Sequence, residues 1–242
     1  MRRRHQDDPA TMLKEFVKGI PVVRDVARKA YNALTKNAPA RRPFPGSRTY
    51  WQDRYDRGGN SGVGSYGKFA EFKADVLNSF VIDNNIQTVI EFGCGDGNQL
   101  MLANYPEYIG FDVSPTAIAR CRAQFASERS KSFRSLESYA GERAQLALSL
   151  DVIYHLIEDD AFEEHMRGLF AAATRFVIIY SSDTDANEGN ENTHVKHRKF
   201  TSWVEANCLG WSREGHIPNR YPYHGDYRQG SLAEFFIYKR RT

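Results

Sequence analysis

A glycine-rich turn in the middle of the chain has the residue types of a nucleotide-binding loop. The apolar segment 88–92 carries one acid, Glu91, and Gly93, Gly95 and Gly97 follow it with the spacing GxGxG. Glycines after a strand let the backbone approach a ligand closely. The GxGxxG spacing of dinucleotide sites is absent from this turn, which disfavours a nicotinamide or flavin cofactor.

Two further apolar segments end in a carboxylate. Asp112 closes the second segment, 19 residues after Gly93, and Asp151 closes a third, which continues as DVIYHL. A carboxylate at the end of the second strand of such a unit accepts hydrogen bonds from both hydroxyls of a ribose. The coincidence of Glu91, the glycine turn, Asp112 and Asp151 predicts a nucleoside-containing cofactor and disfavours a turn without a ligand.

These segments resemble the cofactor motifs of class I S-adenosylmethionine-dependent methyltransferases, with EFGCGDG as the first motif and GFDVS as the second. The resemblance spans roughly residues 51–238. It implies a Rossmann-like α/β fold, in which a seven-stranded, mostly parallel sheet has a reversed last strand and helices on both faces. It also implies S-adenosylmethionine as the cofactor and methyl transfer as the reaction.

The resemblance assigns roles to matching positions. Glu91 and the turn Gly93–Gly97, which includes Cys94, Gly95 and Asp96, are expected to hold the methionine part of the cofactor; Asp112 holds the ribose and Val113 packs against adenine. Asp151 completes the expected cofactor site. Ser135 stands where the family usually has an aspartate that contacts the adenine amine. Tyr66, in the run SGVGSYG, is expected to close over the cofactor, and a flexible glycine-rich loop is the alternative.

Three histidines are candidates for a general base. His155 follows Asp151 by four residues, and His194 and His197 lie in a long segment after the apolar run that ends at Tyr180. A hydroxyl acceptor must lose a proton, and histidine is the side chain whose pKa lies nearest neutrality. A packing histidine at position 155 and a solvated basic loop at 194–197 are the alternatives. Because the histidine spacing is not diagnostic of a metal site, no metal is predicted.

Hydrophobic patterns indicate the elements that position these residues. Short apolar runs alternate with helical stretches, which is typical of a parallel sheet covered by helices. Strands are predicted at 88–92, 108–111, 146–151, 176–180 and 233–238, and helices at 99–103, 115–125, 161–173 and from about residue 68.

The composition is that of a soluble globular protein. A chain of 242 residues, 41% of them hydrophobic, can bury one α/β domain with an appendage. Its three cysteines are far apart and form no CxxC pair, which indicates reduced thiols. No apolar run reaches the roughly 18 residues of a membrane span, and no signal-peptide pattern is present. We therefore predict a cytoplasmic protein.

Basic charge is concentrated at the N-terminus. Residues 1–46 hold eleven lysines and arginines against four acids, a net charge of +7, so the whole-chain charge of +3 leaves −4 for residues 47–242. We predict a basic amphipathic helical arm with a proline-rich linker over 1–46 and the methyltransferase domain over 47–242. The apolar positions of 12–36 repeat at helical spacing, which suits either peripheral contact with the inner membrane surface or packing on the same domain or a second subunit. The acidic balance of 47–242 disfavours nucleic acid as a partner.

The segment after the linker indicates the class of the methyl acceptor. Its WxxRY and SGxGSYG patterns, which begin at Trp51 and Ser61, resemble those of methyltransferases associated with surface-polysaccharide and glycolipid assembly. We predict an O-methyltransferase that acts on a sugar hydroxyl of a glycan or glycolipid. The alternatives are a small-molecule O- or N-methyltransferase of secondary metabolism and a catalytically silent, membrane-associated partner of a glycan enzyme.

Overall fold

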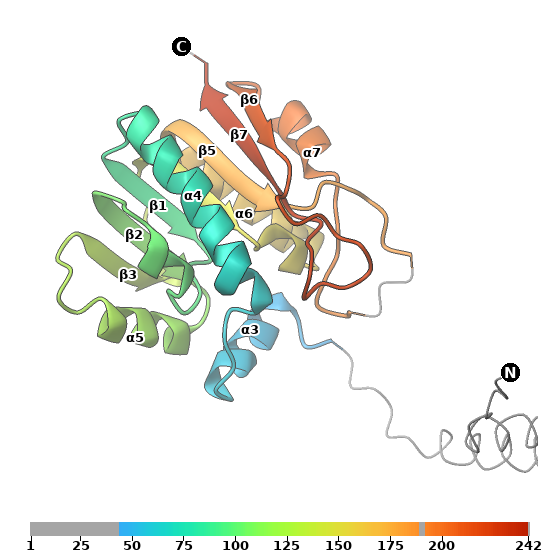
Figure 1. The fold of residues 1–242 in the computed structure, drawn as a ribbon, viewed down its shortest axis with the longest axis horizontal. Helices are drawn as coiled ribbons and strands as arrows, with labels where there is room; N and C mark the ends of the chain where they lie inside the picture. Colours follow the sequence, from blue (N-terminus) through green and yellow to red (C-terminus); the bar gives the residue numbers. More distant parts are fainter. Residues whose placement is uncertain (1–43, 189–191, 242) are drawn as a thin grey trace, which may run out of the picture. The chain divides into compact units, whose positions relative to one another are not determined.

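A single mixed sheet forms the centre of the described part of the chain. The computed structural model describes residues 44–188 and 192–241, so nearly all of the predicted arm, with its 12–36 segment, lies outside the described residues. The strands are β1 (Thr88–Phe92), β2 (Glu107–Asp112), β3 (Lys131–Ser135), β4 (Ala144–Leu150), β5 (Ala173–Ser181), β6 (Trp211–Ile217) and β7 (Glu234–Arg240). Their order in the sheet is β3-β2-β1-β4-β5-β7-β6 (Figure 1).

The direction of the strands brings the predicted cofactor residues to one edge. β1 pairs in parallel with β2 and β4, and β4 pairs in parallel with β5, whereas β7 is antiparallel to both β5 and β6. The carboxyl ends of β1, β2 and β4 therefore lie at the same edge, where Gly93, Asp112 and Asp151 end or follow their strands. This topology confirms the predicted seven-stranded, mostly parallel sheet with a reversed last strand.

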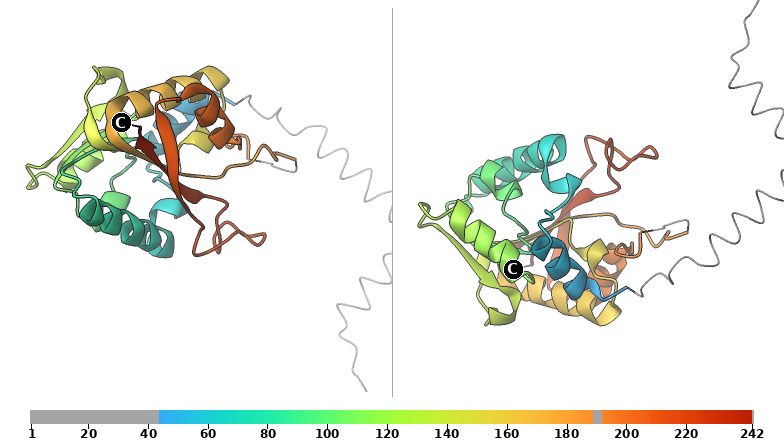
Figure 2. Two further views of the ribbon diagram at one scale, coloured as in Figure 1. Left: turned by 90° about the horizontal axis from the view of Figure 1, so that it is seen from above. Right: turned by 90° about the horizontal axis from the view of Figure 1, so that it is seen from below.

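Helices cover both faces of the sheet, as predicted. The α-helices are α3 (Ser47–Asp56), α4 (Gly67–Asp83), α5 (Pro115–Gln124), α6 (Asp159–Ala172) and α7 (Phe200–Asn207), and short 3-10 turns lie at Val63–Ser65, Gln99–Leu102, Leu136–Ser138 and Ile153–His155. The two views of Figure 2 place α4 and α6 on opposite sides of the strands. Within the described residues, no helix is both long and apolar enough to cross a bilayer.

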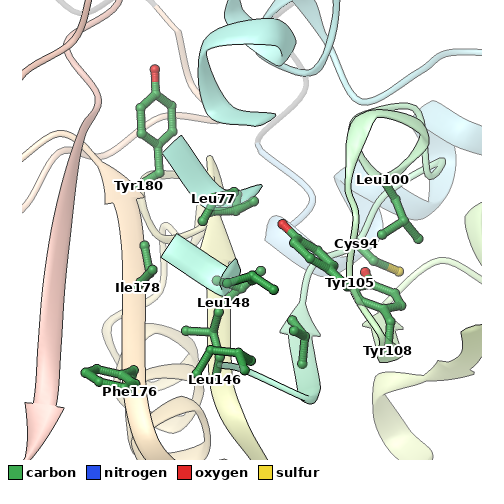
Figure 3. Close-up of a cluster of buried hydrophobic side chains, with 14 of the residues drawn as sticks. Leu77, Cys94, Leu100, Tyr105, Tyr108, Leu146, Leu148, Phe176, Ile178 and Tyr180 are labelled. Atoms are coloured by element: carbon green, nitrogen blue, oxygen red, sulfur yellow. The ribbon is translucent and has the colours of Figure 1, made fainter. Parts of the chain in front are cut away.

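The alternation of side-chain direction along each strand explains why the sheet has a hydrophobic core on each face. Val89 of β1 belongs to a core with residues of α4 and α5, and the next residue, Ile90, belongs to a second core with residues of α6 and α7. Successive side chains of a strand point to opposite faces, so a fully apolar strand needs a cover on both. Figure 3 shows part of the first core, in which Leu77 of α4 lies with Leu146 and Leu148 of β4.

One predicted element is different in the structure. The helix expected at 99–103 is a 3-10 turn over Gln99–Leu102, and Ala103 is already extended. Only four residues separate Leu102 from the start of β2 at Glu107, which leaves no room for a longer helix. The glycine turn is therefore followed by a short connection and not by a helix whose N-terminus faces a ligand.

Candidate active site

A cavity of about 930 Å³ opens where the carboxyl ends of β1, β2 and β4 meet. Its size is that of a pocket for a small molecule or cofactor. Eight of the predicted site residues line it: Glu91, Gly93, Cys94, Gly95, Asp112, Val113, Asp151 and His155. The other six lie outside its lining: Tyr66, Asp96, Gly97, Ser135, His194 and His197.

The glycines of the turn are required by the chain itself. Gly93 and Gly95 have φ angles of 88° and 58°, in the left-handed region that disfavours other residues. A Cβ atom on Gly93 would lie 2.4 Å from Cγ2 of Val152, and one on Gly95 would lie 2.3 Å from Oγ of Ser61. Backbone conformation and packing thus explain both glycines, so they are not evidence of a ligand. That evidence comes from the neighbouring side chains.

Asp112 is buried at the floor of the cavity and held by backbone amides. Gly95 N donates to its Oδ2 at 2.9 Å, and Ser114 N donates to its Oδ1 at 2.8 Å. Burial raises the pKa of Asp112 to about 6, although these backbone hydrogen bonds oppose the shift. Each carboxylate oxygen accepts more than one hydrogen bond, so the fixed carboxylate can still receive two hydroxyls. This geometry suits a ribose.

Glu91 lies on β1 beside the same floor. Tyr108 OH donates to its Oε2 at 2.6 Å, and 6% of the residue is exposed. Burial raises the pKa of Glu91 from 4.5 to about 7, although the Tyr108 hydrogen bond and the charge of Lys73 oppose the shift. The side chain therefore changes charge near neutral pH, and it is anionic above about pH 7.

This shift predicts a pH-dependent stability. Because the folded state holds the Glu91 proton more tightly than the unfolded chain, stability should fall as pH rises from about 4.5 to about 7 and stay lower above. Glu91→Gln should therefore melt at a higher temperature than the wild type at about pH 8 and at nearly the same temperature at about pH 5. Thermal melts at both pH values check this; equal melting temperatures at the higher pH would contradict it. The pKa of Asp112 is raised as well, so the stability of Glu91→Gln should still fall with rising pH, but less steeply than that of the wild type.

A buried ion pair joins α4 to the end of β4. Lys73, which is 1% exposed, places its Nζ 2.6 Å from Oδ2 of Asp151, and Tyr154 OH donates to Oδ1 at 2.8 Å. Asp151 has a φ angle of 59°, which is unusual for a residue other than glycine. Both Lys73 and Asp151 line the cavity. The sequence interpretation missed Lys73, although its position between Phe69 and Leu77 on the apolar face of α4 is a signal for a buried, paired lysine.

His155 is the predicted base that faces the cavity. Its Nδ1 lies 2.9 Å from the carbonyl oxygen of His194. A carbonyl only accepts hydrogen bonds, so Nδ1 carries the proton and Nε2 keeps its lone pair. Burial lowers the pKa of His155 to about 4, so the ring is neutral at physiological pH. A general base requires a neutral ring with an unprotonated nitrogen, and this is the form of His155.

The other two histidines have different surroundings. The His194 ring stacks between His155 and Tyr50, with centroid distances of 5.5 and 4.7 Å. His197 is buried, with Nδ1 2.7 Å from Oγ of Ser182 and with its backbone bonded to Asn187. His194 thus holds His155 through its backbone carbonyl and lies outside the lining of the cavity, whereas His197 holds the late loop against β5.

Tyr66 and Asp96 bind each other beside the cavity. Tyr66 OH donates to Asp96 Oδ2 at 2.9 Å, and Ser61 N donates to the same oxygen at 2.9 Å. Burial alone would raise the pKa of Asp96, but hydrogen bonds from Ser61, Tyr66 and Asn98 outweigh it, and the pKa is lowered. These bonds fasten the segment before α4 to the glycine turn, and through them Ser61 and Ser65 line the cavity in place of Tyr66.

Gly97 and Ser135 are also absent from the lining of the cavity. A Cβ atom on Gly97 would lie 2.9 Å from Phe125, so this glycine packs against the residue that follows α5. Ser135 ends β3 beside Asp112 in register, and the next residues, Leu136 and Glu137, line the cavity instead. The lining of the cavity thus begins one residue after the predicted position.

α3 supplies a wall that the sequence motifs did not identify as a helix. Trp51 lines the cavity and meets the His155 ring edge-on at a centroid distance of 4.8 Å. Gln52 Nε2 donates to Val113 O at 3.0 Å, and Ser47 N and Oγ donate to the Glu158 carboxylate at 2.9 and 2.6 Å. α3 is therefore bound to both sides of the cavity.

Comparisons with known proteins support the fold. No protein-family model and no curated protein matches the sequence. Magnesium protoporphyrin IX methyltransferase from Synechocystis PCC 6803, solved with bound S-adenosylhomocysteine, is similar in structure with a TM-score of 0.57 and 16% identity over 80% of this chain and 97% of that one. The N-methyltransferase NodS from Bradyrhizobium japonicum WM9, in complex with S-adenosylhomocysteine, has a TM-score of 0.60 and 12% identity over 81% of this chain and 98% of that one. An O-methyltransferase family protein from Burkholderia thailandensis has a TM-score of 0.54 and 13% identity over 72% of this chain and 57% of that one. The fold is the Rossmann-like fold of class I methyltransferases.

Proposed function

We propose that this chain is an S-adenosylmethionine-dependent methyltransferase. The observation that carries the proposal is the buried Asp112 carboxylate, which Gly95 N and Ser114 N fix at the floor of the cavity. It lies at the carboxyl end of β2, where ligands bind in open α/β sheets. Structures of the same fold were solved with S-adenosylhomocysteine, the product form of this cofactor.

The residues around the cavity fit such a cofactor. Asp112 would accept the ribose hydroxyls, and Val113, Leu136 and Leu156 give an apolar wall for adenine. Glu91 and the Lys73–Asp151 pair would face the charged methionine end, where acidic and basic groups are both needed. When bound, the cofactor supplies an electrophilic methyl carbon, and the protein must align the acceptor and exclude water.

We further propose that the acceptor is a sugar hydroxyl of a glycan or glycolipid. His155 supports oxygen as the acceptor atom, because its lone pair at Nε2 can receive a hydroxyl proton within the cavity. Trp51 supports a sugar, since an indole in the cavity wall offers a flat apolar face for a pyranose ring. The WxxRY and SGxGSYG patterns begin at this wall. A cytoplasmic location, with the arm at 12–36 on the inner membrane surface, would bring the domain to such acceptors.

An acceptor panel tests the sugar hydroxyl. Transfer of a radiolabelled methyl group from S-adenosylmethionine would be measured with nucleotide-sugars, lipid-linked saccharides, small phenols and small amines. We expect saccharides to be methylated, with label that resists the treatments that hydrolyse esters. Turnover of a small amine or phenol without any saccharide would contradict the glycan proposal and leave the methyltransferase proposal intact.

His155→Gln tests the base with the acceptor that the panel identifies. We expect kcat to fall by about 10² to 10⁴, the usual contribution of a general base, with binding of S-adenosylhomocysteine unchanged. His194→Ala is the matched control, because it removes a neighbouring ring but keeps the carbonyl that bonds His155 Nδ1. If both variants kept wild-type kcat, histidine base catalysis would be excluded.

A further inference from the structure

A second hollow lies at the other end of the sheet from the cavity. It is a groove of about 510 Å³, and none of its lining residues also lines the cavity. Arg143 precedes β4, Arg240 ends the antiparallel β7, and Trp211 begins β6, so the groove lies at the amino end of β4 and beside the last turn of α6. Nothing in the methyl-transfer proposal uses it.

The groove combines cationic and aromatic side chains. Arg143, Arg167 and Arg240 line it with Trp203 and Trp211, and no acidic residue is among its described lining. The guanidinium carbon of Arg167 lies 5.6 Å from the Trp203 ring centroid, and that of Arg240 lies 6.0 Å from the Trp211 ring centroid. Indole faces next to guanidinium groups therefore repeat along the groove.

The positive charge of the groove is weakly neutralised. Arg167 pairs with Glu163 at 3.2 Å, but both side chains are at least half exposed, so this pair contributes little and exchanges readily. A neutral ligand would cover the arginines without giving Arg143 or Arg240 a partner, which is unfavourable. A ligand with carboxylate or phosphate groups would pair with them, since a guanidinium binds such groups through two parallel hydrogen bonds.

We propose that this groove binds an acidic segment of a glycan, with sugar rings on the indoles of Trp203 and Trp211 and acidic groups on the arginines. The groove favours a ligand that enters it over a membrane surface, because Leu209, which is 75% exposed, is the one exposed large apolar residue of its lining. We choose a glycan among the possible ring-bearing anions because of the acceptor proposed above. The proposal that the groove binds an anion does not depend on that acceptor. A chain held here would raise its own concentration at the distant cavity.

Cys208 offers a local readout of binding. It lines the groove and is half-buried, whereas Cys94 and Cys121 are buried in the core. Burial raises the pKa of the Cys208 thiol to about 11, so its alkylation is slow and is best followed at alkaline pH. A ligand in the groove should slow it further. This readout separates the groove from the basic arm, which attracts any polyanion.

The test uses the full chain and trigalacturonate, an acidic trisaccharide, with neutral galactotriose as the comparison. We expect trigalacturonate to protect Cys208 and galactotriose to give no protection. Arg240→Glu should weaken protection at least about tenfold, because it replaces a partner of the anion with a like charge. Arg129→Glu, which reverses an exposed charge in the loop before β3, is the matched control and should bind as the wild type does.

Three results would overturn the inference. Equal protection in Arg240→Glu and the wild type would place the saccharide elsewhere. Equal protection by inorganic polyphosphate would show a site for charge alone, without recognition of sugar rings. Protection by phosphatidylglycerol vesicles in place of trigalacturonate would identify a membrane surface. Binding of S-adenosylhomocysteine to the wild type is measured in parallel. Its absence would count against the methyltransferase proposal and not against the groove.

Discussion

Asp112→Ala is expected to reduce the affinity for S-adenosylhomocysteine by about 10² to 10⁴. The variant loses an acceptor for two ribose hydroxyls, and hydrogen bonds to a charged group contribute about 1.5 to 3 kcal/mol each. It also leaves Gly95 N and Ser114 N without their carboxylate, so the glycine turn loses an anchor. Calorimetric titration measures the affinity directly.

A conservative variant separates the two effects of this substitution. Asp112→Asn keeps one carbonyl oxygen for a backbone amide, but its NH2 group faces a second donor. We expect intermediate affinity, with a folded domain by circular dichroism. An Asp112→Ala protein that is folded and binds S-adenosylhomocysteine as the wild type does would show that Asp112 holds no ribose.

The largest loss of stability is expected from Lys73→Met. Methionine fills most of the lysine volume, but it leaves the Asp151 carboxylate, with a 12% exposed side chain, without the ammonium group 2.6 Å away. Removing one partner of a buried pair typically costs about 3 to 5 kcal/mol. Urea denaturation would show this as a lower free energy of unfolding at neutral pH.

The double variant Lys73→Met/Asp151→Asn tests whether the charge is the cause. Asparagine tolerates the left-handed backbone of position 151 and still accepts the Tyr154 hydrogen bond, so it removes only the unpaired charge. We expect it to regain most of the lost stability. A double variant as unstable as Lys73→Met would indicate that packing around the lysine, and not the ion pair, supports the site.

Local patterns were sufficient for the centre of the sheet. β1 was predicted at its observed bounds, β2, β4 and β7 within two residues, and β5 within three, because apolar strands between helices are buried on both faces. β3 and β6 were not predicted from hydrophobicity. They lie at the two edges of the sheet, where β3 buries only Phe133 and β6 buries no residue fully. Their existence followed from the resemblance and not from their own residues.

The candidate site was predictable where residues follow a strand. Asp112 and His155 line the cavity because strand ends meet at one edge, and sequence order fixes that. Contacts between distant segments were not accessible: Lys73 meets Asp151 across 78 positions, and the His194 carbonyl meets His155 across 39. Tyr66 and Asp96 have suitable side chains for a ligand, yet they bind each other. Only the packed structure shows which polar groups already have partners.

Calorimetric titration of the purified full chain with S-adenosylhomocysteine, with NAD as the comparison, tests whether this cavity binds the methyl donor. We expect saturable binding of one S-adenosylhomocysteine per chain, its loss in Asp112→Ala, and no heat from NAD. A folded protein that binds no S-adenosylhomocysteine, or that binds NAD in its place, would contradict the assignment of this cavity to a methyl donor.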